Sequence, residues 1–302
     1  MINMQRKIKK LKNLIFIVIC LILFSCSKNT TIEKDVIIDE TTESEEETTE
    51  IIIEEKAMLV NTTDFRPNED DFFGMEKDER PIYSVKAEAG DKQRYKKIAM
   101  TFDSGNSLDQ TIKLLDVLDL YNVKCTFFLT FDSMRQGPEL VKEIVNRGHE
   151  VANHSTTHPH FKELTREQIY EELKVPHEFV KNLCGVEMNL FRFPYGSYDD
   201  ESVKAVKEFG YYPIQWSNDS IDWKNEGVEP IVLRICDDEK LYSGAILLFH
   251  NGPKYTVDAL PVVINYIRDK GFEFVKVSDI IYPHDFEIRI ATGKQYKKGE
   301  SR

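Results

Sequence analysis

Short apolar runs alternate with helical patterns along residues 97–282, and this alternation constrains the fold more than any other feature of the chain. The runs are rich in β-branched and aromatic residues, as buried strands are. An order in which strands and helices alternate predicts an α/β domain with a mainly parallel sheet covered by helices. Seven strands could form either an incomplete barrel or an open doubly wound sheet. The seven runs are Ile98–Phe102, Val123–Leu129, His149–Asn153, Leu190–Phe193, Tyr212–Trp216, Ala245–Phe249 and Phe272–Val275.

The segments between the apolar runs carry signals for the ends of helices. Pro138 is well placed to open one helix, and Gly148 to close it. Thr165 and Gln168 have the spacing of a capping box, in which each side chain binds the other residue's backbone N–H. We therefore expect a helix that begins after Thr165 and ends near Gly185.

The first 26 residues have the pattern of a bacterial export signal. Five basic residues precede the apolar stretch 14–24, which is short for a membrane-spanning helix. Leu23-Phe24-Ser25-Cys26 resembles a lipobox, in which the cysteine becomes lipid-modified after cleavage. We expect a lipoprotein signal peptide over 1–26 and a lipid anchor to the bacterial cell membrane at Cys26. An ordinary signal peptide or an uncleaved anchor would also place the rest of the chain outside the cytoplasm.

The chain that follows the signal is strongly acidic. Removing 1–26, which contains five basic residues and no acidic one, lowers the net charge from −12 to −17. Such a charge argues against nucleic acid as a partner. Thr and Glu dominate residues 41–55, so we expect an acidic disordered tether over 27–60. We interpret 61–96 as a lead-in segment that packs along the domain edge, and 283–302 as a solvated C-terminal tail.

Polar residues typical of catalytic sites follow several of the predicted strands. Asp103, Arg192 and His250 stand at or just beyond the ends of three apolar runs. In parallel α/β folds the active groups lie at the C-terminal ends of the strands. His154 and His158 are four residues apart and can share a divalent metal ion. Ser155 follows the first histidine where a zincin protease has glutamate, so that class of protease is disfavoured.

Five short motifs near the predicted strand ends occur in the order known from one family. Together they resemble those of the polysaccharide deacetylases, carbohydrate esterase family four, and the resemblance covers about Lys97–Ile281. It implies a distorted (β/α) barrel with about seven parallel strands, so we expect a polysaccharide deacetylase domain over 97–282. Five motifs in order are far more specific than one alone. The motifs are TFDSG (Thr101–Gly105), HSTTHP (His154–Pro159), RFPYG (Arg192–Gly196), DSIDW (Asp219–Trp223) and LFH (Leu248–His250).

The resemblance also implies roles for the residues in these motifs. Asp103 would be the general base that deprotonates the attacking water, and Arg192 would orient it. His154 and His158 would hold a divalent metal ion, which is most often zinc in this family. A divalent cation polarises the amide carbonyl and lowers the pKa of bound water from about 15.7 toward about 7.

The remaining motif residues would serve the leaving group and the substrate. The resemblance makes His250 the general acid that protonates the leaving amine, and Asp222 the residue that favours its charged form. Trp223 would shield this pair of residues. The backbone at Tyr195 would help to stabilise the oxyanion, and Leu248 would line the pocket for the acetyl methyl group.

Ser104 departs from the family pattern. The family has a second aspartate at this position, which is the third metal ligand, and a serine hydroxyl is a weaker, neutral ligand. Three interpretations follow: His154, His158 and water hold the metal, or the metal affinity falls, or the chain no longer catalyses the reaction. Branches of the family that act on peptidoglycan often carry a non-acidic residue here. We therefore interpret Ser104 as a variant of a working metal site.

The resemblance implies a hydrolase that acts on a linear amide C–N bond and removes N-acetyl groups from the amino sugars of a glycan. Peptidoglycan is the substrate we expect, because an anchor and tether would hold the domain beside the membrane where wall glycan is assembled. A chitin-like or exopolysaccharide polymer of N-acetylglucosamine is an alternative substrate. A non-catalytic glycan-binding lipoprotein is a second hypothesis, which the departure at Ser104 motivates.

Overall fold

The computed structural model describes residues 80–104 and 110–300, all of which belong to one compact unit. The predicted signal peptide over 1–26, with Cys26, and the predicted tether over 27–60 lie outside these ranges, as do residues 61–79 of the lead-in segment. Within the described ranges, no helix has the length and apolar character needed to cross a membrane.

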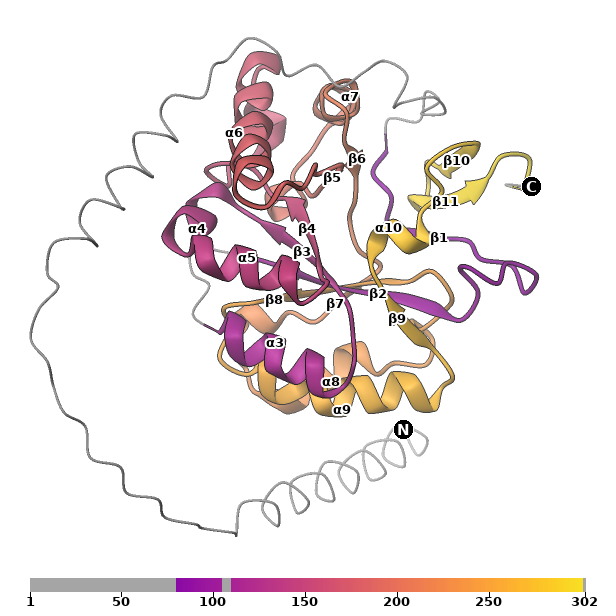
Figure 1. The fold of residues 1–302 in the computed structure, drawn as a ribbon. Coiled ribbons are helices and arrows are strands. Elements are labelled where there is room, and N and C mark those ends of the chain that lie inside the picture. The colour runs from indigo at the N-terminus through magenta and orange to yellow at the C-terminus, as the bar shows by residue number, and fades with distance from the viewer. Residues whose placement is uncertain (1–79, 105–109, 301–302) are drawn as a thin grey trace, which may run out of the picture. The chain divides into compact units, whose positions relative to one another are not determined.

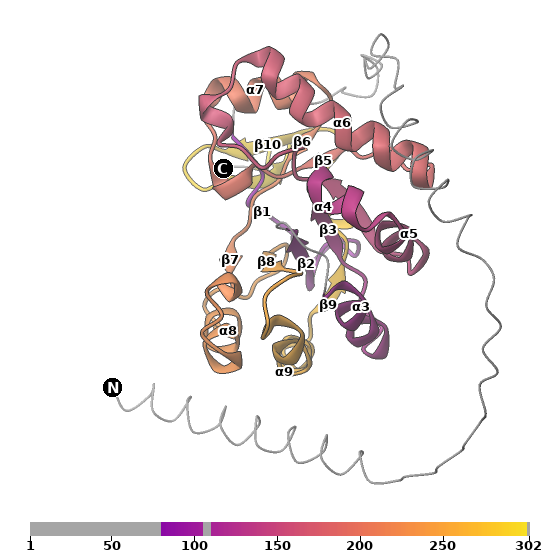
Figure 2. The ribbon, with the colours of Figure 1, turned by 90° about the vertical axis from the view of Figure 1, so that its left-hand side faces the viewer.

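One parallel sheet forms the centre of the domain, and helices surround it (Figures 1 and 2). Its strand order is β6-β5-β4-β3-β2-β8-β7, and β9 pairs with the first residues of β2. The predicted distorted (β/α) barrel is confirmed. The strands are β2 (Lys97–Asp103), β3 (Thr126–Leu129), β4 (Glu150–Asn153), β5 (Leu190–Phe191), β6 (Tyr212–Pro213), β7 (Asn218–Asp219), β8 (Ile246–His250) and β9 (Glu273–Val275).

The helices begin and end where the local sequence favours it. Helix α6 starts with a capping box, in which Thr165 Oγ1 accepts the N–H of Gln168 and Gln168 Oε1 accepts that of Thr165. It ends at Gly185, whose φ of 68° suits glycine. The helices are α3 (Thr111–Leu120), α4 (Phe131–Gln136), α5 (Pro138–Asn146), α6 (Arg166–Cys184), α7 (Asp200–Glu208), α8 (Val228–Ile235), α9 (Thr256–Asp269) and α10 (Val277–Ile280).

The lead-in segment links strand β6 at one end of the barrel sheet to the start of β8. Ile82 donates its N–H to Pro213 O of β6 at 2.8 Å, and Val85 donates its N–H to Gly244 O, just before β8, at 2.9 Å. Gly244 has a φ of 83°, and a Cβ there would lie 2.1 Å from Val85 O. Only glycine allows this close approach of two backbone segments. Residues 82–85 therefore connect the starting end of β8 to β6.

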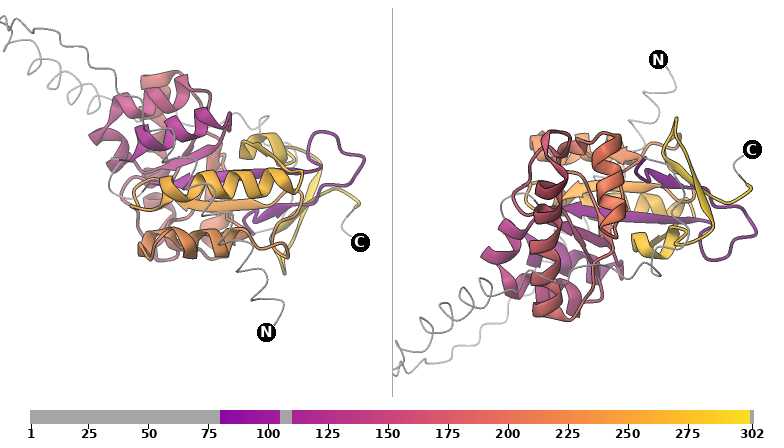
Figure 3. Two further views of the ribbon diagram at one scale, coloured as in Figure 1. Left: turned by 90° about the horizontal axis from the view of Figure 1, so that it is seen from below. Right: turned by 90° about the horizontal axis from the view of Figure 1, so that it is seen from above.

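The prediction that residues 283–302 form a solvated tail is wrong. They contain β10 (Phe286–Arg289) and β11 (Lys294–Lys297), which form a three-stranded sheet with β1 (Ser84–Val85). Figure 3 shows these two strands, in yellow, at one end of the described domain. Gln295 is fully buried, and its amide group exchanges two hydrogen bonds of 2.8 Å with the backbone of Tyr282. This sheet packs at the end of the barrel where β8 starts, opposite the strand ends that carry the site.

Candidate functional site

The register of the two central strands places the expected catalytic residues on one face of the sheet. Thr101 of β2 is paired with Leu248 of β8, and Asp103 with His250. Because alternate residues of a strand point to the same face, all four side chains share one face. Asp103 and His250 are also the last residues of their strands, so they lie at the C-terminal edge of the sheet.

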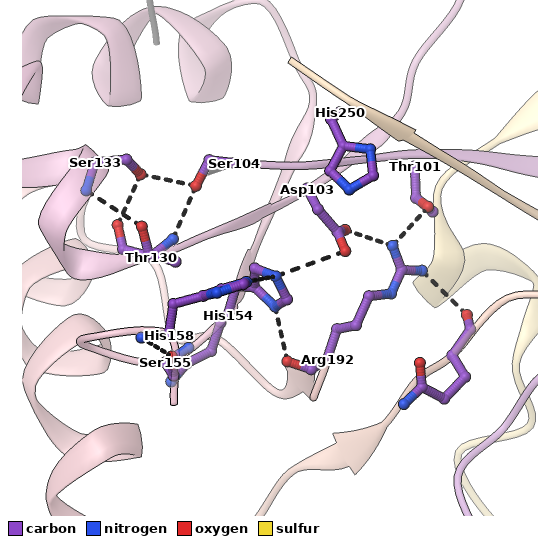
Figure 4. A network of polar contacts seen from close by, with 12 residues as sticks. Thr101, Asp103, Ser104, Thr130, Ser133, His154, Ser155, His158, Arg192 and His250 are labelled. Carbon is purple, nitrogen blue, oxygen red and sulfur yellow. Dashed lines mark hydrogen bonds and ion pairs between the residues drawn. The ribbon is translucent and has the colours of Figure 1, made fainter. Parts of the chain in front are cut away.

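Asp103 and Arg192 form a buried ion pair (Figure 4). Arg192 Nη1 donates to Asp103 Oδ1 at 2.6 Å and to Thr101 Oγ1 at 2.8 Å, while Nη2 donates to the carbonyl oxygen of Gln215 at 3.1 Å. The guanidinium lies 4.0 Å from the ring centre of Phe128, and Arg192 is 0% exposed. Burial raises the pKa of Asp103, and the charge of Arg192 opposes this rise. The pair therefore supplies a desolvated carboxylate in a fixed orientation.

The turn after β4 brings His154 and His158 together. Ser155 and His158 have φ angles of 78° and 61°, in the left-handed region that few non-glycine residues adopt. The Nε2 atoms of the two histidines face each other at 3.2 Å. His154 Nδ1 must be protonated, because it donates to the carbonyl oxygen of Arg192 at 2.8 Å. In the neutral ring, His154 Nε2 therefore carries the free lone pair.

These two histidines fit a metal ion. Burial lowers the pKa of both His154 and His158 to about 3, so both rings are neutral at physiological pH, as metal binding requires. Two nitrogens bound to one tetrahedral zinc ion lie about 3.3 Å apart, close to the spacing found here. The backbone acceptor on His154 Nδ1 is the usual second partner of a metal-bound histidine. Asp103 Oδ2 lies 3.7 Å from His154 Nε2.

Within residues 80–104 and 110–300, no three His, Cys, Asp or Glu side chains form a metal-binding group. Ser104, which stands where the family has its third metal ligand, is buried, and its hydroxyl is engaged elsewhere (Figure 4). Ser104 Oγ accepts the N–H of Thr130 at 3.0 Å and lies 2.7 Å from Ser133 Oγ. Its assignment as a ligand therefore stays a prediction, and Gly105 of the same motif lies outside the described residues.

His250 and Asp222 form the second pair. Nδ1 of His250 donates to Asp222 Oδ1 at 2.7 Å, and the backbone N–H of His250 donates to Oδ2 at 2.9 Å. Thr256 Oγ1 also donates to Oδ2, at 2.6 Å. Burial alone would lower the pKa of His250, but its contacts with Asp222, together with the charges of Asp103 and Asp219, outweigh burial and the net shift is upward. These contacts favour the charged imidazolium and fix the proton on Nδ1.

The residues expected to meet substrate lie at the rim and in the wall of the site. Tyr195 has a φ of 58° and is 65% exposed; its ring stacks on His160 at 4.4 Å and meets the edge of His158 at 4.4 Å. Trp223, next to Asp222, is 55% exposed, whereas Leu248 is buried in β8. The exposed rings can contact a sugar, and Leu248 lies in the wall.

Two residues of the site were not predicted. Thr256 binds Asp222 from the start of α9, and Glu172 of α6 binds the turn between the two histidines. Neither belongs to a short motif, and both reach the site only because their helices pack against it. The motif order could not have identified them.

The polysaccharide deacetylase family model matches residues 90–214 of the chain. A peptidoglycan-N-acetylglucosamine deacetylase of Bacillus cereus is 35% identical over 193 residues, which cover 62% of this chain and 89% of that protein. The peptidoglycan-N-acetylmuramic acid deacetylase PdaA of Bacillus subtilis is 31% identical over 197 residues, which cover 64% of this chain and 74% of that protein. Two further relatives are covered less completely: the match spans 66% of a second B. cereus deacetylase and 42% of PgdA from Listeria monocytogenes.

Solved structures of similar proteins include one named as a deacetylase and one described as a pseudoenzyme. The Bc1960 peptidoglycan N-acetylglucosamine deacetylase has a TM-score of 0.61 and 29% identity, covering 67% of this chain and 92% of that one. BA3943 of Bacillus anthracis, described as a CE4 family pseudoenzyme, has a TM-score of 0.62 and 26% identity, covering 73% of this chain and 74% of that one. A mutant of BA3943 is described as having restored enzymatic activity.

Proposed function

This chain belongs to the polysaccharide deacetylase family, and on that premise we propose that it is a metal-dependent hydrolase that removes N-acetyl groups from peptidoglycan. One observation carries the proposal. A buried Asp103–Arg192 pair and a His250–Asp222 pair end neighbouring strands, and two neutral histidines face each other beside Asp103. Amide hydrolysis needs this combination of a base, an acid and a group that stabilises the oxyanion.

A divalent metal ion, most often zinc in this family, would be held by His154 and His158 and would polarise the amide carbonyl. The residues of the chain supply the rest of the chemistry. Asp103, ionised and oriented by Arg192, accepts a proton from the attacking water. The bond from Arg192 Nη1 to Asp103 Oδ1 leaves Oδ2, which faces the histidines, as the oxygen that takes this proton.

His250 supplies a proton to the leaving nitrogen. Its Nδ1 is bound by Asp222, so Nε2 is the atom that can donate to substrate. The raised pKa of His250 keeps the ring charged at higher pH than an ordinary histidine. Base and acid thus differ in protonation at one pH, as general acid–base catalysis requires. The backbone at Tyr195 helps to stabilise the oxyanion, and Leu248 lines the pocket for the acetyl methyl group.

Peptidoglycan is the proposed substrate because relatives of two kinds act on it. One is named for N-acetylglucosamine and the other for N-acetylmuramic acid. A relative from Bradyrhizobium, 29% identical, is named a chitooligosaccharide deacetylase, so a polymer of N-acetylglucosamine is the alternative substrate. We also propose that Cys26 carries a lipid anchor that keeps the domain at the outer face of the bacterial cell membrane. The lipobox-like sequence before Cys26 supports this location.

A non-catalytic glycan-binding protein is the second candidate function. Ser104 favours this candidate, because the polysaccharide deacetylase family has a metal-binding aspartate at this position. The similarity to a pseudoenzyme gives the same alternative a precedent within the fold.

The test is release of acetate from purified peptidoglycan and, separately, from chitooligosaccharide by the full chain in detergent. We expect acetate from peptidoglycan in the presence of zinc, and almost none from the Asp103→Asn variant. Mass spectrometry of the digested glycan then identifies the deacetylated sugar. Glycan that is retained by the protein without any release of acetate would support the binding protein instead.

A further inference from the structure

A carboxylate from helix α6 holds the turn that carries the two facing histidines. Glu172 Oε2 accepts the backbone N–H groups of Thr156 and Thr157, each at 2.9 Å. Its other oxygen, Oε1, accepts the hydroxyl of Thr157 at 2.7 Å. The hydroxyl of Thr156 donates to the backbone carbonyl of Glu172 at 3.1 Å. One side chain thus binds both residues at the middle of the turn.

Side chains also bind the other backbone N–H groups of this turn. The N–H of Ser155 donates to Asn153 Oδ1 at 2.9 Å, and that of His158 donates to Ser155 Oγ at 3.0 Å. The four N–H groups of residues 155–158 therefore all donate to side-chain oxygens. Left-handed φ angles at Ser155 and His158 cost free energy and persist only where surrounding contacts impose them. Glu172 supplies two of these four contacts.

The two histidines depend on Glu172 to different degrees. His154 follows the last residue of β4, and its Nδ1 is held by the carbonyl of Arg192. His158 lies beyond the turn, and its position follows from the conformation of Thr156 and Thr157. Loss of the Glu172 carboxylate would therefore release His158 while leaving His154 in place.

We propose that Glu172 is a positioning residue, which holds His158 Nε2 opposite His154 Nε2 and so prepares the turn to bind a metal ion. This inference rests on the metal-dependent function proposed above. Helix α6 is a rigid support, because it is 19 residues long and begins with a capping box. Fixing the turn before the metal arrives removes the entropy cost of ordering it on binding. Residues behind metal ligands contribute about 10- to 100-fold to metal affinity.

The chain offers matched variants that separate charge, hydrogen bonding and stability. Glu172→Ala removes the acceptor for both N–H groups. Glu172→Gln keeps one oxygen to accept them, and its NH₂ group can donate to the Thr157 hydroxyl. Glu171→Ala is the control, because it removes the same charge from the neighbouring exposed position of α6.

The experiment titrates Co²⁺ into the metal-free full chain in detergent and measures the dissociation constant from the cobalt absorption bands. We expect Glu172→Ala to weaken Co²⁺ binding by about 10- to 100-fold, Glu172→Gln to weaken it less, and Glu171→Ala to leave it unchanged. Turnover at saturating Co²⁺ should recover in Glu172→Ala, since the variant retains every group that contacts substrate. Urea unfolding of each metal-free variant shows whether stability changes alongside.

The outcomes distinguish the role of Glu172 from the proposed function. If Glu172→Ala is less stable but binds Co²⁺ as the wild type does, the role of Glu172 is merely structural and the inference is overturned. If Glu172→Ala does not fold, the affinity of Glu172→Gln decides, and an unchanged affinity again overturns it. If the wild type binds Co²⁺ but releases no acetate, the proposed function fails. The Co²⁺ affinities of the Glu172 variants still show whether Glu172 positions His158. Wild-type chain that binds no Co²⁺ overturns both.

Discussion

Asp222 binds His250 through both of its carboxylate oxygens. Oδ1 accepts the ring Nδ1–H at 2.7 Å, and Oδ2 accepts the backbone N–H of the same residue at 2.9 Å. The first bond fixes which ring nitrogen faces the site, and the second fixes the end of β8 on which the ring is carried. The side chain of Asp222 is 0% exposed, so its charge acts on the imidazole with little screening by water.

Asp222→Asn should shift the pH dependence of the reaction. His250 acts in its charged form, so activity falls as the pH rises through its pKa, which Asp222 helps to hold above the ordinary value. The asparagine oxygen can still accept Nδ1–H, but the negative charge is gone. We therefore expect the descending limb of the kcat/KM profile to move to lower pH. Thr256→Val, which removes one donor to Asp222 and leaves the charge, is the control and should move the limb little.

Arg192→Met should destabilise the fold at neutral pH by about 3–5 kcal/mol, because it leaves the buried Asp103 carboxylate without its counter-ion. Without the guanidinium, the pKa of Asp103 in the folded state rises further above its value in the unfolded state. The folded state then binds the proton more tightly, so the loss of stability should shrink as the pH falls. Urea unfolding across pH measures this. The account of the ion pair would be contradicted if the stability lost in Arg192→Met stayed constant with pH. It would also be contradicted if adding Asp103→Asn did not restore that stability.

Ser104→Ala tests what the buried hydroxyl does. The N–H of Thr130 would lose its acceptor in a buried position, which costs about 1–3 kcal/mol. Because the hydroxyl is engaged with Thr130 and Ser133, we expect metal affinity to be unchanged. Urea unfolding and Zn²⁺ competition titrations measure the two quantities. A loss of metal affinity as large as that of His158→Ala would identify Ser104 as a ligand.

A chain that ends at His284 should unfold at lower urea concentration than the full chain. The truncation removes β10 and β11, and with them the buried side chains of Phe286, Ile288 and Gln295. It also leaves β1 without its partner strand. Deletion of residues 301–302 alone is the control. Equal midpoints for both truncated chains would restore the original prediction of a solvated tail.

All seven predicted apolar runs contain strands of the barrel. Most of these strands are buried on both faces, because residues such as Phe102 and Leu247 have no exposed face. The exception is β9, which is only partly buried. Strand β7 was missed because Asn218-Asp219 is polar and its pairing with β8 spans two residues. Strand β11 was missed because Lys294-Gln295-Tyr296-Lys297 is polar, and its burial depends on the partner strands β1 and β10.

The same limit applies to the site. Motif order identified the groups that end neighbouring strands, such as Asp103 and His250, because the parallel sheet brings these ends together. It could not say where the Ser104 hydroxyl points, nor that Glu172 reaches the histidine turn. Those positions depend on how α4 and α6 pack against the sheet. The residues adjacent to Ser104 and Glu172 in the sequence carry no signal for that packing.

The proposed function requires a metal ion held by His154 and His158. To test this, metal is stripped from the full chain, Zn²⁺ is titrated back, and acetate released from peptidoglycan is followed, with His158→Ala in parallel. We expect wild-type activity to vanish on chelation and return saturably, while His158→Ala requires far more Zn²⁺ or stays inactive. Acetate release that persists in the chelator, or a His158→Ala response equal to that of the wild type, would contradict the claim.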